Sequence, residues 1–188
     1  MGSLSHQEIE KLEMENQSLK SEIENLKNSI LSNRGEALTA QVYSRYPFDG
    51  SKNIVINIGE SDGVEVGMAV LTKENFLIGN IVNASNHSSE VETIFNIDWR
   101  KSVVIEEREN QALLVGGNTP IVDLIPKDEL INIGDRVLSI SPDFPLNTLI
   151  GTVKEIENDP NEPWIRAQVN VPYDLKNIQE VIVLIQFP

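Results

Sequence analysis

The chain has no cysteine and only two histidines among its 188 residues. Without thiols it can form no disulfide and use no cysteine nucleophile, and two histidines leave few nitrogen ligands for a zinc site. It also lacks a run of about 18 apolar residues, which is the length that a membrane-spanning helix needs. These absences exclude thiol chemistry and argue against a zinc enzyme.

Positive charge is also scarce. The sequence has 15 lysines and arginines against 29 acidic residues, for a formal net charge of −14. No cluster of basic residues interrupts this acidic balance. Nucleic-acid backbones and anionic lipid surfaces are both bound through concentrated positive charge. We therefore expect no nucleic-acid partner and no binding of this segment to an anionic membrane surface.

A heptad pattern is present near the N-terminus. It places Ile at the a positions, Leu at the d positions and one Asn at an a position: Ile9, Leu12, Asn16, Leu19, Ile23, Leu26 and Ile30. Ile at a with Leu at d favours two parallel strands, and a buried Asn fixes their register at a cost in stability. We predict a parallel homodimeric coiled coil over residues 7–34, with these residues as its interface.

The charges beside this seam agree with a parallel pair. Glu15 faces Lys20 of the partner subunit, and Glu22 faces Lys27 of the partner subunit. Each exposed pair contributes only ~0.3–0.5 kcal/mol, so the apolar seam supplies most of the stability. The alternative is an amphipathic helix packed on its own globular domain, although such helices usually carry a wider apolar stripe.

After Gly35 the helical period disappears. Short runs rich in Val and Ile alternate with Gly, Asn, Asp and Pro, as is typical of small barrels or sandwiches. Strands are predicted at residues 38–43, 53–58, 68–71, 76–82, 92–95, 101–106, 112–115, 121–125, 136–140, 149–156, 165–171 and 180–185. The predicted fold class is mainly β, with an N-terminal α-helical parallel dimeric coiled coil followed by two small β-barrels.

The predicted domains follow from these segments. Residues 1–6 are read as a remnant of cloning followed by the helix start, and residues 7–34 as the coiled coil. The first barrel is placed at residues 38–107 and the second at residues 108–188. The sequence leaves open whether the last strand returns to the first barrel.

The two sets of strands also resemble each other. Residues 66–71 match residues 133–138, residues 77–81 match residues 149–153, and residues 95–97 match residues 169–171. Glycine accepts backbone angles closed to other residues, and a glycine inside a strand suits a bulge or a barrel corner. We predict structural turns at Gly63, Gly67, Gly79, Gly134 and Gly151.

One run carries a family resemblance. Residues 59–70 read Gly-Glu-Ser-Asp-Gly-Val-Glu-Val-Gly-Met-Ala-Val, which resembles the G-x-x-D-G-V-x-x-G-M-x-V segment of the bacterial cell-shape family MreC. Further matching segments follow in the family's order at residues 77–82, 88–91, 133–137, 144–145, 150–153 and 174–181. A coiled coil just before two β-domains is also the arrangement of this family.

The resemblance implies a function and a location. Members of the family dimerise and scaffold the machinery that elongates the peptidoglycan wall. Their partners are penicillin-binding proteins, the membrane protein MreD and the actin-like MreB. The resemblance also implies an extracytoplasmic position on the bacterial cell membrane. The single-pass anchor of the natural protein would then lie upstream of this chain.

Catalysis is not expected. A Ser-His-Asp triad needs a histidine base in a shielded cleft, but only His6 and His87 are present. His87 lies in residues 83–90, which we predict to be an exposed polar loop. The sequence has no phosphate-binding glycine motif, and residues 159–163 lack the glycine and terminal glutamate of a calcium loop. We predict no catalytic, cofactor-binding or metal-binding residue, and therefore no enzyme.

The sequence also offers two candidate binding residues, both tryptophans, and two alternative functions. Trp99 and Trp164 each follow a turn at a strand end, where a tryptophan can anchor a partner but more often packs the end of a barrel. A periplasmic adaptor of an efflux system also joins coiled coil to β-domains, but it needs two heptad segments. A relative of the chymotrypsin-like double-barrel proteases is opposed by the histidine count.

Overall fold

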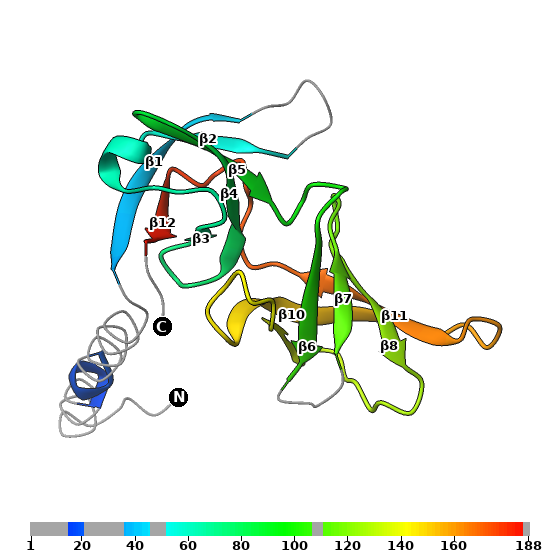
Figure 1. The fold of residues 1–188 in the computed structure, drawn as a ribbon. Coiled ribbons are helices and arrows are strands. Elements are labelled where there is room, and N and C mark those ends of the chain that lie inside the picture. The colour runs from blue at the N-terminus through cyan, green and yellow to red at the C-terminus, as the bar shows by residue number, and fades with distance from the viewer. Residues whose placement is uncertain (1–14, 21–35, 46–51, 107–110, 186–188) are drawn as a thin grey trace.

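The computed structural model describes residues 15–20, 36–45, 52–106 and 111–185. Within these ranges the chain forms two closed β-barrels and a helical stretch at residues 15–20 (Figure 1). The predictions of a mainly β fold and of two barrels are therefore confirmed. Most of the heptad segment lies outside the described residues, so the parallel coiled coil stays a prediction.

The first barrel closes in the strand order β1-β12-β3-β4-β5-β2, with antiparallel neighbours throughout. Its core is formed by buried side chains that alternate with more exposed ones along a strand. In β2, Ile54 and Ile56 are buried, whereas Val55 between them is partly exposed. The strands are Ala37–Arg45 (β1), Ile54–Ile56 (β2), Ala69–Leu71 (β3), Leu77–Ser85 (β4), Ser88–Thr93 (β5) and Glu180–Leu184 (β12). A 3₁₀ turn at Glu60–Asp62 follows β2 and ends at Gly63, whose φ of 85° is left-handed.

The second barrel closes in the order β10-β11-β8-β7-β6-β9. Its strands are Arg100–Ile105 (β6), Ala112–Val115 (β7), Ile121–Pro126 (β8), Arg136–Ser139 (β9), Thr148–Glu157 (β10) and Trp164–Asn170 (β11). The β10–β11 ribbon projects beyond the rest of the barrel (Figure 1). At its tip the Asn161 backbone N–H donates to the Asp159 carboxylate at 2.8 Å, which stabilises a turn there.

The predicted boundary between residues 107 and 108 does not match the topology. Strand β6 precedes that boundary, yet it pairs with β7 and β9 of the second barrel. Strand β12 pairs with β1 and β3, so the chain returns to the first barrel at its end. Local patterns mark where strands occur but carry no signal of which distant strand each one joins.

Strand β5 was placed wrongly at residues 92–95, and residues 83–90 are not an exposed loop. Strand β4 continues to Ser85, and β5 begins at Ser88 after a two-residue turn at residues 86–87. The inward positions of β5 include Ser89 and Thr93 beside Val91, and their hydroxyls donate to backbone carbonyl oxygens. Small polar residues thus fill core positions where an apolar signal was expected.

The internal repeat is visible in the barrels, with one error. The Gly67 N–H donates to the Ile81 carbonyl and the Gly134 N–H to the Val153 carbonyl, each at 2.8 Å. Both glycines are left-handed, with φ of 95° and 98°. Ile81 pairs with Val91, and Val153 pairs with Val169. Val169 therefore corresponds to Val91, and the proposed match of residues 95–97 with 169–171 is wrong.

The two barrels share a continuous apolar core. Leu77 and Ile94 of the first barrel belong to one packed cluster that also contains Trp99, just before β6, and Ile150 of β10 in the second barrel. Phe76 and Leu149 also form a parallel backbone bridge between the barrels. A second buried cluster fills the first barrel. The two barrels therefore pack against each other and are not independent domains joined by a linker.

Candidate interaction sites

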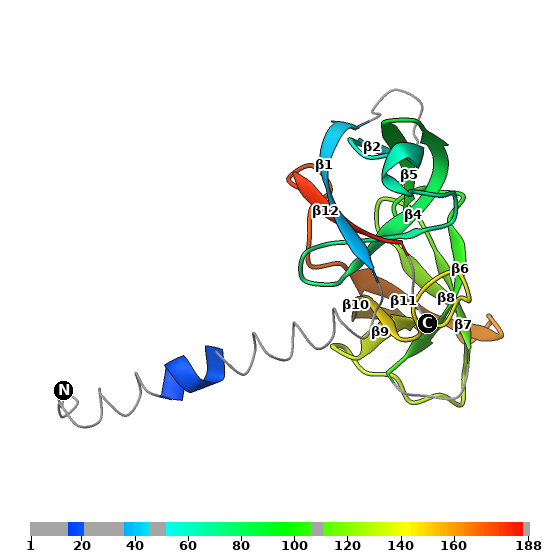
Figure 2. The ribbon, with the colours of Figure 1, turned by 60° about the vertical axis from the view of Figure 1, so that its left-hand side comes forward.

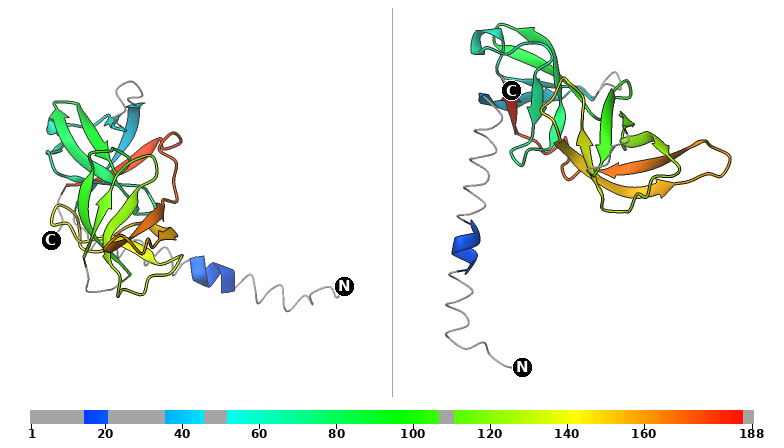
Figure 3. Two further views of the ribbon diagram at one scale, coloured as in Figure 1. Left: turned by 90° about the vertical axis from the view of Figure 1, so that its right-hand side faces the viewer. Right: turned by 60° about the horizontal axis from the view of Figure 1, so that its bottom comes forward.

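The described part of the predicted dimer seam is exposed. Asn16 and Leu19 lie in the helical stretch 15–20, and Leu19 is 52% exposed. This stretch, blue in Figures 2 and 3, lies clear of both barrels, so it does not pack on its own globular domain. Glu15 and Lys20 are exposed on the same stretch. Outside the described residues lie Ile9, Leu12, Glu22, Ile23, Leu26, Lys27 and Ile30.

In the part of the chain that the structure describes, no helix is long and apolar enough to cross a membrane. The described helical stretch carries charged residues at both ends, Glu15 and Lys20. Its surface is therefore mixed, with Leu19 as its apolar contribution.

Two of the predicted turn glycines serve a different purpose from the others. Gly79 and Gly151 lie inside β4 and β10, where a neighbouring strand passes very close. A Cβ atom on Gly79 would lie 1.8 Å from the Glu92 carbonyl oxygen, and one on Gly151 would lie 2.4 Å from the Asn170 carbonyl oxygen. Both barrels therefore use a glycine to let two backbones approach, which bends the sheet into a closed barrel.

His87 does lie beside a serine, but the pair does not form a catalytic arrangement. The Ser61 Oγ atom is 2.9 Å from His87 Nδ1, and the Ser61 hydroxyl donates to the Asn86 carbonyl at 2.6 Å. That bond occupies the hydroxyl proton that a base would have to remove. The other ring nitrogen, Nε2, lies 3.2 Å from the Asn86 side-chain amide rather than beside a carboxylate. Ser61 and His87 are both exposed, so this is a surface turn contact.

The two tryptophans occupy opposite environments. Trp99 is 1% exposed and stacks on Phe144 with the ring centroids 6.0 Å apart. The Lys101 ammonium lies 5.7 Å from the Trp99 ring centroid and donates to the Asp143 carboxylate, which holds the pKa of that carboxyl below its usual value. Trp164, in contrast, is 44% exposed on β11. Trp99 is thus a core residue, and Trp164 is available to a partner.

Tyr173 joins the two barrels at the point where the chain passes from β11 back to β12. Its hydroxyl donates to the Leu77 carbonyl at 2.6 Å. Its ring and that of Phe95 pack in a T-shaped arrangement, with the ring centroids 5.8 Å apart. It packs against both apolar clusters, and burial raises the pKa of its hydroxyl well above the usual value. Nothing in the local sequence singles out Tyr173, because its hydrogen-bond partner is 96 residues away.

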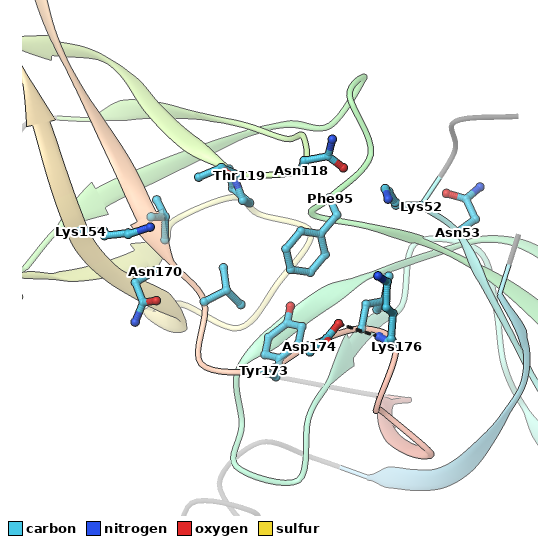
Figure 4. A pocket seen from close by; sticks show the side chains of 14 residues that line it. Lys52, Asn53, Phe95, Asn118, Thr119, Lys154, Asn170, Tyr173, Asp174 and Lys176 are labelled. Carbon is cyan, nitrogen blue, oxygen red and sulfur yellow. Dashed lines mark hydrogen bonds between the residues drawn. The ribbon is translucent and has the colours of Figure 1, made fainter. Parts of the chain in front are cut away.

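A cavity of about 500 Å³ opens beside this joint (Figure 4). Its walls come from the first barrel, the second barrel and the segment of residues 171–176 between β11 and β12. The rings of Phe95 and Tyr173 lie along its apolar part, and Lys52, Lys154 and Lys176 lie around it. Sequence patterns missed this cavity because its lining residues come from separate segments that only the topology brings together.

Apolar side chains that face outward are spread over both barrels. Isolated exposed apolar residues are common on soluble domains, so none of them defines an interface alone. They are the residues from which an apolar docking surface would be built. In the described residues of the barrel region, the large ones are Tyr43, Val66, Val82, Ile97, Leu124, Leu130, Ile133, Leu146 and Trp164.

The barrel region matches a known family. The family described as Rod shape-determining protein MreC, barrel core, matches residues 42–185. The chain is 29% identical over 191 residues to the cell shape-determining protein MreC of Listeria monocytogenes, an alignment that covers 95% of this chain and 64% of that relative. It is 27% identical over 192 residues to the Bacillus subtilis protein of the same name, covering 94% of this chain and 65% of the relative. The chain thus spans just under two thirds of these relatives.

Solved structures share the same fold. The MreC structure from Listeria monocytogenes superposes with a TM-score of 0.70 at 28% identity, covering 94% of this chain and 90% of that chain. A chain from the complex between Penicillin-Binding Protein (PBP2) and MreC from Helicobacter pylori has a TM-score of 0.60 at 17% identity, covering 80% of this chain and 99% of that chain. At 17% identity the second likeness establishes the fold and nothing further.

Proposed function

Because this chain belongs to the MreC family of rod shape-determining proteins, we propose that it is a dimeric scaffold for the machinery that elongates the peptidoglycan wall. Its N-terminal helices pair two copies in parallel, and its barrels present docking surfaces to the enzymes of wall synthesis. Two docking sites on one rigid support raise the effective concentration of their partners without adding contacts. The role is geometric and needs no catalytic residue.

A penicillin-binding transpeptidase is the proposed partner. The observation that carries this proposal is the match to the MreC family over residues 42–185. A neighbour that shares the fold comes from a complex of MreC with PBP2, and it gives the class of partner that we propose. The shared core of the two barrels supports it, since a scaffold has to hold its docking surfaces in a fixed relation. MreD and MreB complete the set of partners on the family resemblance, with the chain held at the extracytoplasmic face of the membrane.

A pull-down tests this partner. The whole chain serves as bait for solubilised membranes whose penicillin-binding proteins carry a fluorescent penicillin, and we expect one elongation transpeptidase to be retained. Alanine substitution at exposed apolar positions such as Trp164 and Leu146 then locates the docking surface. Retention no greater than on an unrelated acidic protein would contradict the proposal.

Removing residues 1–34 is expected to leave folded, largely monomeric barrels. The described helical stretch makes no part of either apolar cluster, so its loss removes no described core contact. Sedimentation equilibrium should give the mass of one copy, and circular dichroism should retain the β signal. A shortened chain that loses its β signal would show that helix and barrels are not separate units.

The substitution Asn16→Val is expected to stabilise the helix pair by ~1–3 kcal/mol and to relax its strand number. A buried amide costs about this much relative to an apolar side chain, and the same amide restricts register and oligomeric state. Analytical ultracentrifugation with thermal unfolding provides both readouts. A strict dimer without any gain in stability would remove Asn16 from this role.

A further inference from the structure

The cavity between the barrels collects positive charge in an acidic protein. Lys52 precedes β2 of the first barrel, Lys154 lies in β10 of the second, and Lys176 lies in the segment that links β11 to β12. The chain as a whole has a formal net charge of −14. The charged residues that line the cavity are these three lysines and Asp174. The local charge is therefore opposite in sign to that of the protein.

These three ammonium groups are also the ones left without a partner. In residues 52–106 and 111–185, the other basic side chains form ion pairs or donate to backbone carbonyls: Lys73 with Glu180, Lys101 with Asp143, Arg136 with Glu106, Arg166 with Asp123, Arg100 with Ile97 and Lys127 with Asp159. The side chains of Lys52, Lys154 and Lys176 have no such contact with a described residue. The available positive charge of the described barrels is thus concentrated around one cavity.

Asp174 offsets one of the three positive charges, so three lysines and one aspartate leave the lining with a net charge of +2. Its carboxylate accepts a hydrogen bond from the Lys176 backbone N–H at 3.0 Å (Figure 4). It accepts another from the Asn177 side chain at 3.3 Å. The carboxylate therefore stabilises the turn in which it lies. The Lys176 ammonium remains available to a ligand.

The rest of the lining suits a peptide better than a bare phosphate. Asn118, Thr119 and Asn170 line the cavity, and their side chains have no hydrogen bond to a described residue. A side-chain amide offers both a donor and an acceptor, which match the C=O and N–H of a peptide group. A phosphate accepts hydrogen bonds and therefore needs only donors from the protein. Phe95 adds apolar surface, and about 500 Å³ lies within the range of small-ligand pockets.

We propose that this cavity binds a short acidic peptide segment of a partner protein. Lys154 lies on one side of the Phe95 ring, and Lys52 and Lys176 lie on the other (Figure 4). The occupant that matches this arrangement carries two carboxylates separated by an apolar residue, which packs against Phe95. The site uses neither helix pairing nor any property of the transpeptidase, so it goes beyond the proposed function.

Titration of the whole isotopically labelled chain with two peptides tests the site. The first probe is the peptide Gly-Glu-Leu-Glu-Gly with blocked ends, and the second has glutamine in place of both glutamates. We expect the acidic peptide to shift the backbone amide signals of Phe95, Asn118 and Asn170, and added salt to weaken its binding. Equal binding of the glutamine peptide, or displacement by inorganic phosphate at the same concentration, would overturn the proposal.

Lysine variants provide the matched comparison. Each of Lys52→Gln, Lys154→Gln and Lys176→Gln is expected to raise the Kd of the acidic peptide about two- to fivefold, with larger losses in combination. Lys127→Gln removes the same charge from an exposed position outside the cavity and should leave the Kd unchanged. An unchanged Kd in the triple variant, or an equal loss with Lys127→Gln, would refute the site. Either result leaves capture of the transpeptidase unaffected, so the two proposals fail separately.

Discussion

Replacing Gly79 by alanine is expected to destabilise the protein by at least ~3 kcal/mol. The new Cβ atom would lie 1.8 Å from the Glu92 carbonyl oxygen, and that oxygen belongs to the backbone of the adjacent strand β5. Overpacking of a well-packed core typically costs about 1–3 kcal/mol and occasionally more, and a backbone neighbour cannot move aside as a side chain can. Thermal unfolding should show a drop in Tm of about 6–12 °C or more.

Gly67→Ala provides the control for Gly79→Ala. A Cβ atom on Gly67 meets no other atom within 4 Å, and the only penalty is its left-handed backbone, with φ of 95°. That conformation costs an alanine roughly 1–2 kcal/mol. Gly79 has no left-handed backbone, so its loss should come from the close approach of strands alone. A loss for Gly79→Ala no larger than that for Gly67→Ala would contradict this account of the glycine inside β4.

Replacing Tyr173 by alanine is expected to cost ~3–5 kcal/mol, and Tyr173→Phe ~1–3 kcal/mol. The alanine variant leaves a cavity where the ring packs against both apolar clusters and Phe95. The phenylalanine variant retains the ring but removes the bond to the Leu77 carbonyl oxygen at 2.6 Å. Urea unfolding of the whole chain measures both losses, and two equal losses would contradict a separate contribution from the hydroxyl.

The buried hydroxyl of Tyr173 should also make the free energy of unfolding depend on pH. Burial raises the pKa of its hydroxyl above the value of about 10 that it has in the unfolded chain. Its contribution is therefore fully present below pH ~10 and is lost as the pH rises above that value, because the unfolded state then releases the proton first. Between pH 9 and 11 the wild-type chain should lose unfolding free energy faster than Tyr173→Phe. Parallel curves would show that the hydroxyl is not shielded.

Much of the strand layout followed from local sequence. Runs of Val and Ile between turn residues located the strands, and residues 112–115 were predicted with the ends that the structure has. The exception was β5, where Ser89 and Thr93 occupy inward positions and hide the apolar alternation. Their hydroxyls donate to the carbonyl oxygens of Ile58 and Lys52, on either side of β2, and a pattern based on hydrophobicity gives no sign of these hydrogen bonds.

Pairing between distant strands was the part that the sequence could not settle. The assignment of β6 to the second barrel and of β12 to the first depends on contacts between strands far apart along the chain. The inter-barrel joint and its cavity depend on the same pairing of distant strands. The cavity's Lys52, Lys154 and Lys176 come from separate segments and share no local sequence pattern. The heptad seam, by contrast, is a purely local signal, and within the described residues its Leu19 lies exposed and clear of the barrels.

Dimeric docking is tested most directly by sedimentation velocity of the whole chain mixed with the purified extracytoplasmic domain of the cell's elongation transpeptidase. We expect a complex with the mass of two chains and two transpeptidases at saturating concentrations. Two species that sediment independently, or a complex of one chain with one transpeptidase under the same conditions, would contradict a paired scaffold.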